Sequence, residues 1–311
     1  MSEESTTHES RVLFEDKKKH NLDVYALLDH LQESCRLEQE MDVGQRWAKV
    51  QVTLPRPDLP LFLWHLCDPH LGSKKTDYQL FKRDYEIVKN TPNFTVVTNG
   101  DEVDNFLVGM GRMSSGVYEN PISPEQQAKL LRGLFKTLDQ DGKLLVFTFG
   151  NHNQLSKRAG LKFENTWLAD FACPVLNCGG LLTIGYGKQT YRVALSHLYW
   201  GNSKLNITNA PKRFMEFEYP EADIALLGHT HNKAVEVFTR AGRVRVAGVG
   251  GTYKLFDEHS PQSGLGFRNI GAGGLCLALY PDRKQIVPFY TVEEAYQFYQ
   301  SISRGKGAIS K

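Results

Sequence analysis

Five short polar clusters constrain this chain more than any other feature, because four of them directly follow an apolar run that is typical of a β-strand. The runs cover residues 61–67, 94–98, 144–149 and 224–227. The clusters are Asp68-Pro69-His70, Gly100-Asp101-Glu102-Val103-Asp104, Gly150-Asn151-His152-Asn153, the single His197, and Gly228-His229-Thr230-His231. Open α/β sheets bind their ligands at the carboxyl ends of the strands. The pattern therefore predicts one site built from several strand ends.

The segments between the first three clusters indicate crossover helices. Residues 78–88 carry apolar side chains at helical spacing, and Ser123, Pro124 and Gln126 form the signature of a capped helix start. Alternation of strand and helix predicts a parallel sheet. After residue 177, short strands between glycine-rich turns predict a second, mostly antiparallel sheet, and residues 292–302 predict a closing helix.

We expect three parts in the chain: a disordered tail over residues 1–10, a helical appendage with a linking strand over residues 11–59, and the main domain over residues 60–311. The appendage has apolar residues at helical spacing from Val24 to Cys35. The basic run at residues 17–20 precedes it. This run fits either a nucleic-acid-binding helix or a solvated surface helix, and the second interpretation is favoured because short charge runs are usually solvated.

Composition limits the class of protein. The 311 residues include 37 basic and 35 acidic side chains, for a net charge of +2, so no general attraction to nucleic acid is expected, although a local basic patch stays open. The five cysteines are irregularly spaced and are expected to be reduced thiols rather than a zinc ribbon. No secretory signal and no apolar stretch of membrane-spanning length is present, so we expect a cytoplasmic protein without a membrane partner.

The residue types in the clusters favour divalent metal chemistry. Carboxylate, imidazole and amide oxygen together suit Mn²⁺, Fe²⁺ or Zn²⁺. Asp68 and His70 are two residues apart and can share one ion, and the two oxygens of Asp101 can bridge two ions. Two bridged ions lie about 3.5–4 Å apart, hold the attacking and leaving oxygens of a phosphoryl displacement, and lower the pKa of a bound water so that hydroxide forms near neutral pH.

The ordered clusters resemble the motifs of the calcineurin-like metallophosphoesterases, over roughly residues 60–288. That family carries Asp-x-His, Gly-Asp-x-x-Asp, Gly-Asn-His-Asp/Glu, His, and Gly-His-x-His in this order. The resemblance implies an α/β fold, a four-layer α/β/β/α sandwich of two mixed sheets. The chain is most similar to the branch that holds repair exonucleases and phosphodiesterases, and residues 99–106 and 251–254 resemble bacteriophage and prophage members of that branch.

The resemblance also implies a role for each cluster residue. The ligands implied for one metal ion are Asp68, His70 and His231, and those implied for the other are Asn151, His197 and His229, with Asp101 bridging the two. His152 is implied as the general acid that protonates the leaving oxygen, and Asp104 as the residue that orients His152. The implied activity is a dinuclear metal-dependent phosphoester hydrolase that uses a metal-bridging hydroxide. Mn²⁺ is the expected ion, with Fe²⁺ or Zn²⁺ as alternatives.

Two positions depart from the family pattern. Asn153 stands where the family usually has an acidic residue, and Asn105 stands where the protein Ser/Thr phosphatases have an arginine. Because the acidic and basic residues pair in those enzymes, we hypothesise that Asn105 and Asn153 form a compensating amide pair.

The substrate is less defined than the chemistry. The glycine-rich stretch 106–121, which contains Arg112, is a candidate substrate wall. Tyr199 and Trp200 follow His197 and are candidates for stacking on a base, or they pack the sheet edge. Lys204, Lys212 and Arg213 are candidate phosphate contacts.

Three hypotheses stay open from the sequence. The first is a nuclease or other phosphodiesterase acting on DNA or RNA, the second is a phosphodiesterase or phosphatase for a small molecule, and the third is a non-enzymatic metal-binding partner protein. A structural site needs ligands but no proton donor, so His152 weighs against the third. The family resemblance also implies a homodimer.

Overall fold

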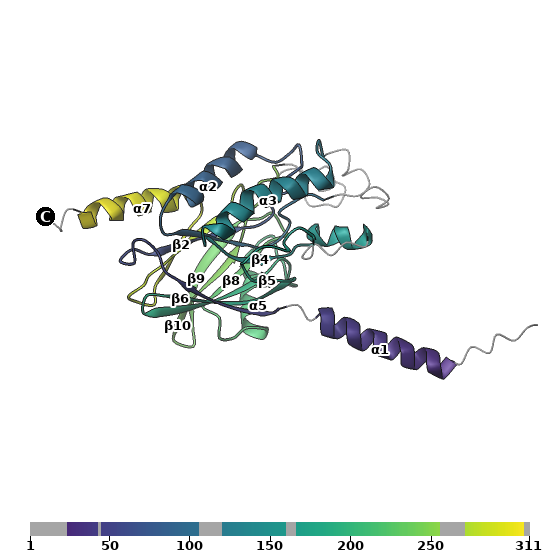
Figure 1. Cartoon of the computed structure of the whole chain (residues 1–311). Helices are drawn as coiled ribbons and strands as arrows, with labels where there is room; N and C mark the ends of the chain where they lie inside the picture. Colours follow the sequence, from purple (N-terminus) through teal and green to yellow (C-terminus); the bar gives the residue numbers. More distant parts are fainter. Residues whose placement is uncertain (1–23, 43–44, 106–119, 160–165, 256–270, 308–311) are drawn as a thin grey trace, which may run out of the picture. The chain divides into compact units, whose positions relative to one another are not determined.

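The computed structural model describes residues 24–42, 45–105, 120–159, 166–255 and 271–307 (Figure 1). The chain divides into two compact units, residues 1–43 and 44–311. In the first unit, helix α1 spans Val24–Asp42, where the spacing of apolar residues predicts a helix. The predicted tail and the basic run at residues 17–20 lie outside the described residues.

The second unit begins at residue 44 rather than at residue 60. Its first strand, β1 (Trp47–Val52), pairs in parallel with β6 (Gly179–Tyr186), so the predicted linking strand is an edge strand of the main domain.

One sheet carries the first three polar clusters. Its strand order is β12-β11-β2-β3-β4-β5. The strands span β2 Leu61–Leu66, β3 Phe94–Thr98, β4 Leu144–Thr148, β5 Val175–Leu176, β11 Leu275–Leu279 and β12 Ile286–Phe289. Strands β2 to β5 are parallel, whereas β11 pairs antiparallel with both β2 and β12. The carboxyl ends of β2, β3 and β4 therefore meet at one edge.

The other sheet has the order β1-β6-β7-β8-β10-β9. The strands that follow β6 span β7 Gln189–Ser196, β8 Ile224–Leu227, β9 Ala234–Arg240 and β10 Arg243–Val249. The pairs β1–β6, β7–β8 and β8–β10 are parallel, and β6–β7 and β9–β10 are antiparallel. The sheet is thus mixed, and the expectation of a mostly antiparallel sheet is wrong. Strands β11 and β12, expected in this sheet, belong to the first one.

Helices cover the outer face of each sheet (Figure 1). On the first sheet lie α2 (Tyr78–Asn90), α3 (Pro124–Gln140) and α7 (Val292–Gly307), and on the second lies α5 (Asn209–Phe217). A short 3₁₀ segment, Asn153–Ala159, follows the third cluster. The α/β fold with four layers in the order helix, sheet, sheet, helix is confirmed.

Alternation along β2 explains why the layers form. Phe62, Trp64 and Leu66 are buried against the helices, while Leu61 and Leu63 are buried against the second sheet. Side chains of a strand point alternately to its two faces, so a strand with apolar side chains on both faces must be covered on both sides. Burial of each such side chain contributes about 1.5–3 kcal/mol.

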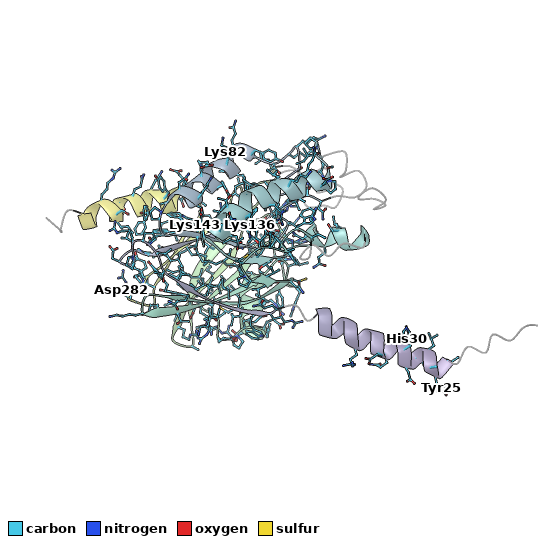
Figure 2. All side chains as sticks on the ribbon, viewed as in Figure 1. Tyr25, His30, Lys82, Lys136, Lys143 and Asp282 are labelled. Atoms are coloured by element: carbon cyan, nitrogen blue, oxygen red, sulfur yellow. The ribbon has the colours of Figure 1, made fainter. Side chains whose placement is uncertain are left out.

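The start of α3 is capped as the sequence predicts. Ser123 Oγ accepts a hydrogen bond from the backbone N–H of Gln126, and the Gln126 side chain accepts one from the Ser123 backbone N–H. This confirms the predicted capping box at the start of α3. At the C-terminal end of α2, Nζ of Lys143, a residue labelled in Figure 2, donates to the carbonyl oxygens of Val88 and Thr91, at 2.7 Å each. Among the described helices, none is both long and apolar enough to cross a bilayer.

Candidate metal centre

The predicted ligands follow five strand ends, three from the first sheet and two from the second. Five of these residues have a backbone in the left-handed region, namely Asp68, His70, Asp101, His229 and His231. The left-handed region is unusual for residues other than glycine, and each such residue costs about 1–3 kcal/mol, which interactions of the surrounding structure must offset. Strain of this kind concentrates at functional sites, because sharp turns bring successive polar side chains to one place.

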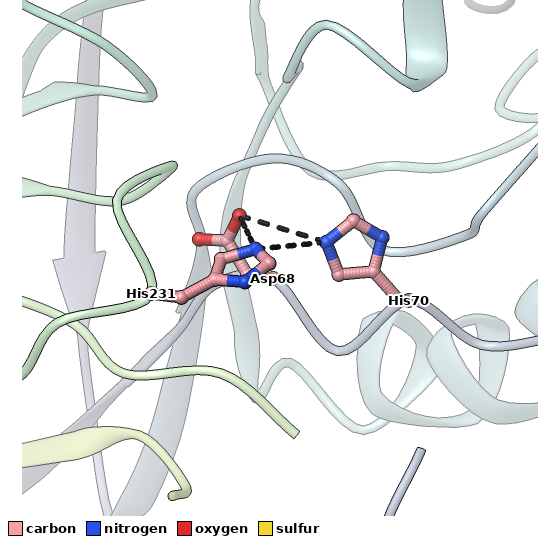
Figure 3. A group of neighbouring side chains, drawn as sticks. All are labelled: Asp68, His70 and His231. Atoms are coloured by element: carbon pink, nitrogen blue, oxygen red, sulfur yellow. Dashed lines mark hydrogen bonds and ion pairs between the residues drawn. The ribbon is translucent and has the colours of Figure 1, made fainter. Parts of the chain in front are cut away.

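The first group consists of Asp68, His70 and His231 (Figure 3). The Nε2 atoms of the two imidazoles are 3.1 Å apart. Asp68 Oδ1 lies 3.3 Å from Nε2 of His231 and 3.9 Å from Nε2 of His70. Oδ1 is buried and has no hydrogen-bond partner within the described residues. A buried carboxylate oxygen facing two imidazole nitrogens has the donor set of a divalent metal site.

The second group consists of Asp101, His197 and His229. Asp101 Oδ2 is 3.3 Å from Nε2 of His197, which is 3.2 Å from Nδ1 of His229. Asn151 Oδ1 joins this group, at 3.0 Å from Nε2 of His197 and 2.9 Å from Nδ1 of His229. The four side chains predicted to bind the second ion therefore lie close together. Three of them would bind it through an imidazole nitrogen or an amide oxygen.

Asp101 also contacts the other side of the cluster. Its carboxylate forms a further group with His70 and His152, whose donor atoms all lie within 4.8 Å of one another. Asp101 Oδ1 accepts a hydrogen bond from the backbone N–H of His152 at 2.8 Å. The carboxylate thus lies between the two ligand groups, where a bridging residue would have to be.

The ring nitrogens that face away from the cluster are held by acceptors. His70 Nδ1 is 2.9 Å from the Asp104 carboxylate, and His197 Nδ1 is 2.8 Å from the carbonyl oxygen of Asn99. An acceptor fixes a proton on Nδ1, so Nε2 is the nitrogen that faces the cluster and is left to bind an ion. Both rings are therefore oriented as metal ligands commonly are.

Asp104 acts on a different histidine from the one expected. Its carboxylate is 2.9 Å from His70 Nδ1 but 4.0 Å from His152 Nδ1, and it is the backbone carbonyl of Asp104 that lies 2.6 Å from His152 Nδ1. Residue 104 thus orients both rings, with the side chain on the ligand and the main chain on His152. The expectation that the carboxylate orients His152 is corrected.

The electrostatics of the site favour a bound cation. Burial raises the pKa of Asp68, but the neighbouring His197 and His231 outweigh burial and hold this pKa at about 2. Burial lowers the pKa of His70 to about 4, so this ring is neutral at pH 7. Burial would also lower the pKa of His197, but the charges of Asp101 and Asp68 raise it to about 10. The buried carboxylates of Asp68 and Asp101 are therefore stabilised by positive charge placed between the ligand side chains.

The hypothesised amide pair does not form. Asn153 Oδ1 accepts from the backbone N–H groups of Asp101 and Gly150, at 2.9 and 2.8 Å, while its Nδ2 donates to Glu102 Oε2 at 2.8 Å. Asn105 instead donates to the carbonyl oxygen of His152 at 2.8 Å. Asn153 needs a donor because its partner is a buried carboxylate, and that explains why an amide stands where the family usually has an acid.

Glycines before the ligands leave space for the cluster. A Cβ on Gly150 would lie 2.1 Å from Asp101 Oδ1, and one on Gly100 would lie 2.5 Å from His197 Nδ1. The glycine in each motif is therefore required by close packing directly beneath a ligand.

Sequence reasoning assigned no role to two buried residues of the site. Lys254 is 1% exposed and its Nζ is 3.0 Å from the Asp104 carboxylate. Asn99 donates from Nδ2 to the carbonyl oxygens of Ser196 and Leu226, at 3.1 and 3.0 Å. In the sequence, only their positions could have pointed to them: Lys254 ends the segment that resembles phage proteins, and Asn99 directly precedes Gly100. No sequence pattern assigned a role to His65 either. This residue is buried, and its Nε2 lies 3.1 Å from Asn99 Nδ2.

The candidate substrate residues differ in placement. Arg112 lies outside the described residues. Tyr199 packs on Phe214, with ring centroids 5.0 Å apart, whereas Trp200 is 58% exposed. Lys212 forms an ion pair with Glu236 at 2.6 Å, so it is already engaged.

Comparison with known proteins gives similarities in structure only. No protein-family model matches the chain, and no curated protein matches its sequence. Three solved structures similar to it are Vps29 complexed with zinc from Entamoeba histolytica (15% identity, TM-score 0.35, 73% of this chain and 98% of that one), a hypothetical protein from Thermus thermophilus (14%, 0.39, 73% and 98%) and a metallophosphoesterase from Sphaerobacter thermophilus (12%, 0.34, 74% and 87%). At these TM-scores the similarities support no inference about function.

Proposed function

We propose that this chain is a calcineurin-like metallophosphoesterase, a dinuclear metal-dependent phosphoester hydrolase that acts on phosphodiesters. The observation that carries the proposal is the proximity of two ligand groups, with Asp101 close to His70 of the first and to His197 and His229 of the second. Each group combines one carboxylate with two imidazoles, and the order of these residues along the chain follows the family motifs. The branch that contains bacteriophage proteins is proposed on the motif resemblance alone.

The residues present fit two divalent ions. Asp68, His70 and His231 would hold one ion, and Asn151, His197 and His229 would hold the other, with Asp101 shared. When bound, such ions supply an activated water near neutral pH and neutralise charge on a phosphate. The donor set suits Mn²⁺, which we propose as the native ion, as well as Fe²⁺ and Zn²⁺.

His152 would supply the proton for the leaving oxygen. Its Nδ1 is held on the Asp104 carbonyl oxygen, so the proton available for transfer resides on Nε2. Nε2 lies 3.8 Å from Asp101 Oδ2, beside the ligand cluster, and His152 belongs to neither proposed set of metal ligands. General acids placed in this way contribute about 10²–10⁴-fold to turnover.

The test is hydrolysis of three kinds of substrate, each with Mn²⁺ and with EDTA. The substrates are bis-p-nitrophenyl phosphate, p-nitrophenyl phosphate, and labelled single- and double-stranded DNA. We expect Mn²⁺-dependent cleavage of the diester and of DNA. Cleavage of the small esters with intact DNA would instead assign a small-molecule substrate. No cleavage by protein shown to hold two ions would overturn the enzymatic proposal and favour a metal-dependent partner protein.

A further inference from the structure

An exposed aromatic ring is built into the loop that follows the metal ligand His197. Trp200 is three residues after His197, so the two Cα atoms lie within about 11 Å of each other. The indole is 58% exposed although large aromatic side chains are usually well buried. An exposed ring this close to the centre calls for an account of what contacts it.

The loop is fixed so that Trp200 is presented to solvent. Tyr199, the preceding residue, packs on Phe214 of α5 and donates from its hydroxyl to Glu218 at 2.9 Å. The carbonyl oxygen of Gly201, the following residue, accepts from Asn209 Nδ2 at 2.8 Å. Both neighbours of Trp200 are therefore anchored to α5 and its end, and the indole between them is held in place.

A cation without an acidic partner lies on this ring. The Arg213 guanidinium carbon is 3.7 Å from the centroid of Trp200 and 5.3 Å from that of Phe217. In the part of the chain that the structure describes, no ion pair or hydrogen bond is formed by the Arg213 guanidinium, and its buried Nε has no hydrogen-bond partner.

Two arginines of the sheet that α5 covers, Arg240 and Arg243, have acidic partners. Arg240 binds Glu216 at 2.8 Å and Arg243 binds Asp223 at 2.9 Å. Even Lys212, adjacent to Arg213 in α5, is paired with Glu236. Arg213 is therefore a positive charge available to an anion from outside the chain, oriented by stacking on aromatic rings.

We propose that Trp200, Arg213 and Phe217, here called the Trp200 platform, bind an unpaired stretch of a nucleic acid substrate. A base would stack on the exposed part of the indole, and a phosphate would contact the Arg213 guanidinium. Stacking on the ring requires a base that is not in a duplex, so the platform selects single strands or frayed ends. The inference rests on the proposed function, because the platform would feed the strand to the neighbouring metal centre.

The experiment measures binding rather than turnover. Full-length protein with Mn²⁺ is titrated into a fluorescein-labelled oligothymidylate with phosphorothioate linkages, which resist hydrolysis, and anisotropy gives Kd at several salt concentrations. Trp200→Ala is expected to raise Kd about 5- to 150-fold, and Trp200→Phe to restore part of the affinity. Arg213→Ala is expected to weaken binding and to reduce the salt dependence by about one phosphate contact.

Arg283→Ala is the matched control. Arg283 also stacks on an aromatic ring, with its guanidinium carbon 4.1 Å from the centroid of Tyr280, but it follows β11 near the end of the sheet opposite the metal ligands. We expect this variant to bind like the wild type. Thermal melts of each variant establish that it is folded before its Kd is compared.

Three results would overturn the platform: no binding by the wild type, equal Kd for the wild type and Trp200→Ala, or a Trp200→Ala variant whose only change is dissociation of a dimer in sedimentation. The last would assign the surface to a second copy of the chain. Hydrolysis of bis-p-nitrophenyl phosphate by the wild type tests the proposed function separately. Diester cleavage without strand binding would refute the platform alone, and strand binding without cleavage would refute the hydrolase alone.

Discussion

The carboxylate of Asp104 lies 2.9 Å from Nδ1 of His70 and 3.0 Å from Nζ of Lys254. A buried lysine, a carboxylate and an imidazole thus form a chain that ends at the metal-facing Nε2 of His70. Outer partners of this kind fix the orientation and basicity of a ligand.

Asp104→Asn should lower metal affinity about 10- to 100-fold while leaving the contact between His152 and the carbonyl oxygen of residue 104 intact. Isothermal titration with Mn²⁺ measures the affinity. Because the substitution also removes the carboxylate that Lys254 Nζ contacts, Asp104→Asn/Lys254→Met is compared alongside, and Asp223→Asn controls for loss of a buried carboxylate elsewhere. Unchanged affinity in both Asp104 variants would show that the carboxylate has no part in metal binding.

His152→Ala should keep both ions and lose most turnover, by about 10²–10⁴-fold, if the ring is the proposed proton donor and not a ligand. The loss should be smaller for a p-nitrophenyl diester, whose leaving group needs little protonation, than for a dinucleotide. Metal content by mass spectrometry and kcat on both substrates check this. Equal losses on the two substrates, or full activity, would remove the general-acid role.

Asp101→Ala should empty or disorder the metal centre, because this carboxylate lies close to His70 of the first ligand group and to His197 and His229 of the second. Metal content after gel filtration measures the effect, with Asp84→Ala as a control for removal of another buried carboxylate. Two tightly bound ions in Asp101→Ala would rule out the bridge.

Asn153→Asp should destabilise the domain by about 1–3 kcal/mol, because a new carboxylate would face buried Glu102 at 2.8 Å and lose a donated hydrogen bond. Thermal melting is the measurement. The double variant Glu102→Gln/Asn153→Asp exchanges donor and acceptor and should recover most of the loss. A double variant no more stable than Asn153→Asp would argue against this pairing.

Addition of Mn²⁺ at about 100 times its Kd should stabilise the protein by about 2.7 kcal/mol per ion, which corresponds to a rise of roughly 5–10 °C in Tm for a domain of this size. Excess EDTA should reverse the shift. Asp68→Asn, which weakens one ligand group, should show a smaller rise, and an identical rise would place the stabilising ion elsewhere.

The ligand clusters could be predicted because their signal is local. A run such as residues 61–67 is apolar at every position except His65 and ends abruptly at Asp68, and that is visible without knowing its neighbours. The pairing of β11 could not be predicted, since Leu275–Leu279 lies more than 200 residues from its partner β2 and is equally apolar on either sheet.

The contacts of Asp104, Lys254 and Asn153 could not be predicted from the sequence, because they depend on the geometry of the fold. Whether Asp104 meets His152 through its side chain or its carbonyl depends on the local turn, in which Asn105 has a φ of 47°. Lys254 reaches Asp104 across 150 positions of sequence. The sequence predicted Asn105 as the partner of Asn153, because the family pairs the residues at those two positions. The actual partner, Glu102, occupies a position of the Gly-Asp-x-x-Asp motif at which any residue is allowed.

Asn99 gives the site one further property. Its side chain joins the strand ends Ser196 and Leu226 of the second sheet, while its carbonyl oxygen holds His197. The ligands are therefore divided between two layers, and a fragment containing only residues 44–159 would lack His197, His229 and His231. Metal affinity would consequently report on whether the two sheets are packed together. A chain whose sheets separate should release its ions before its strands unfold.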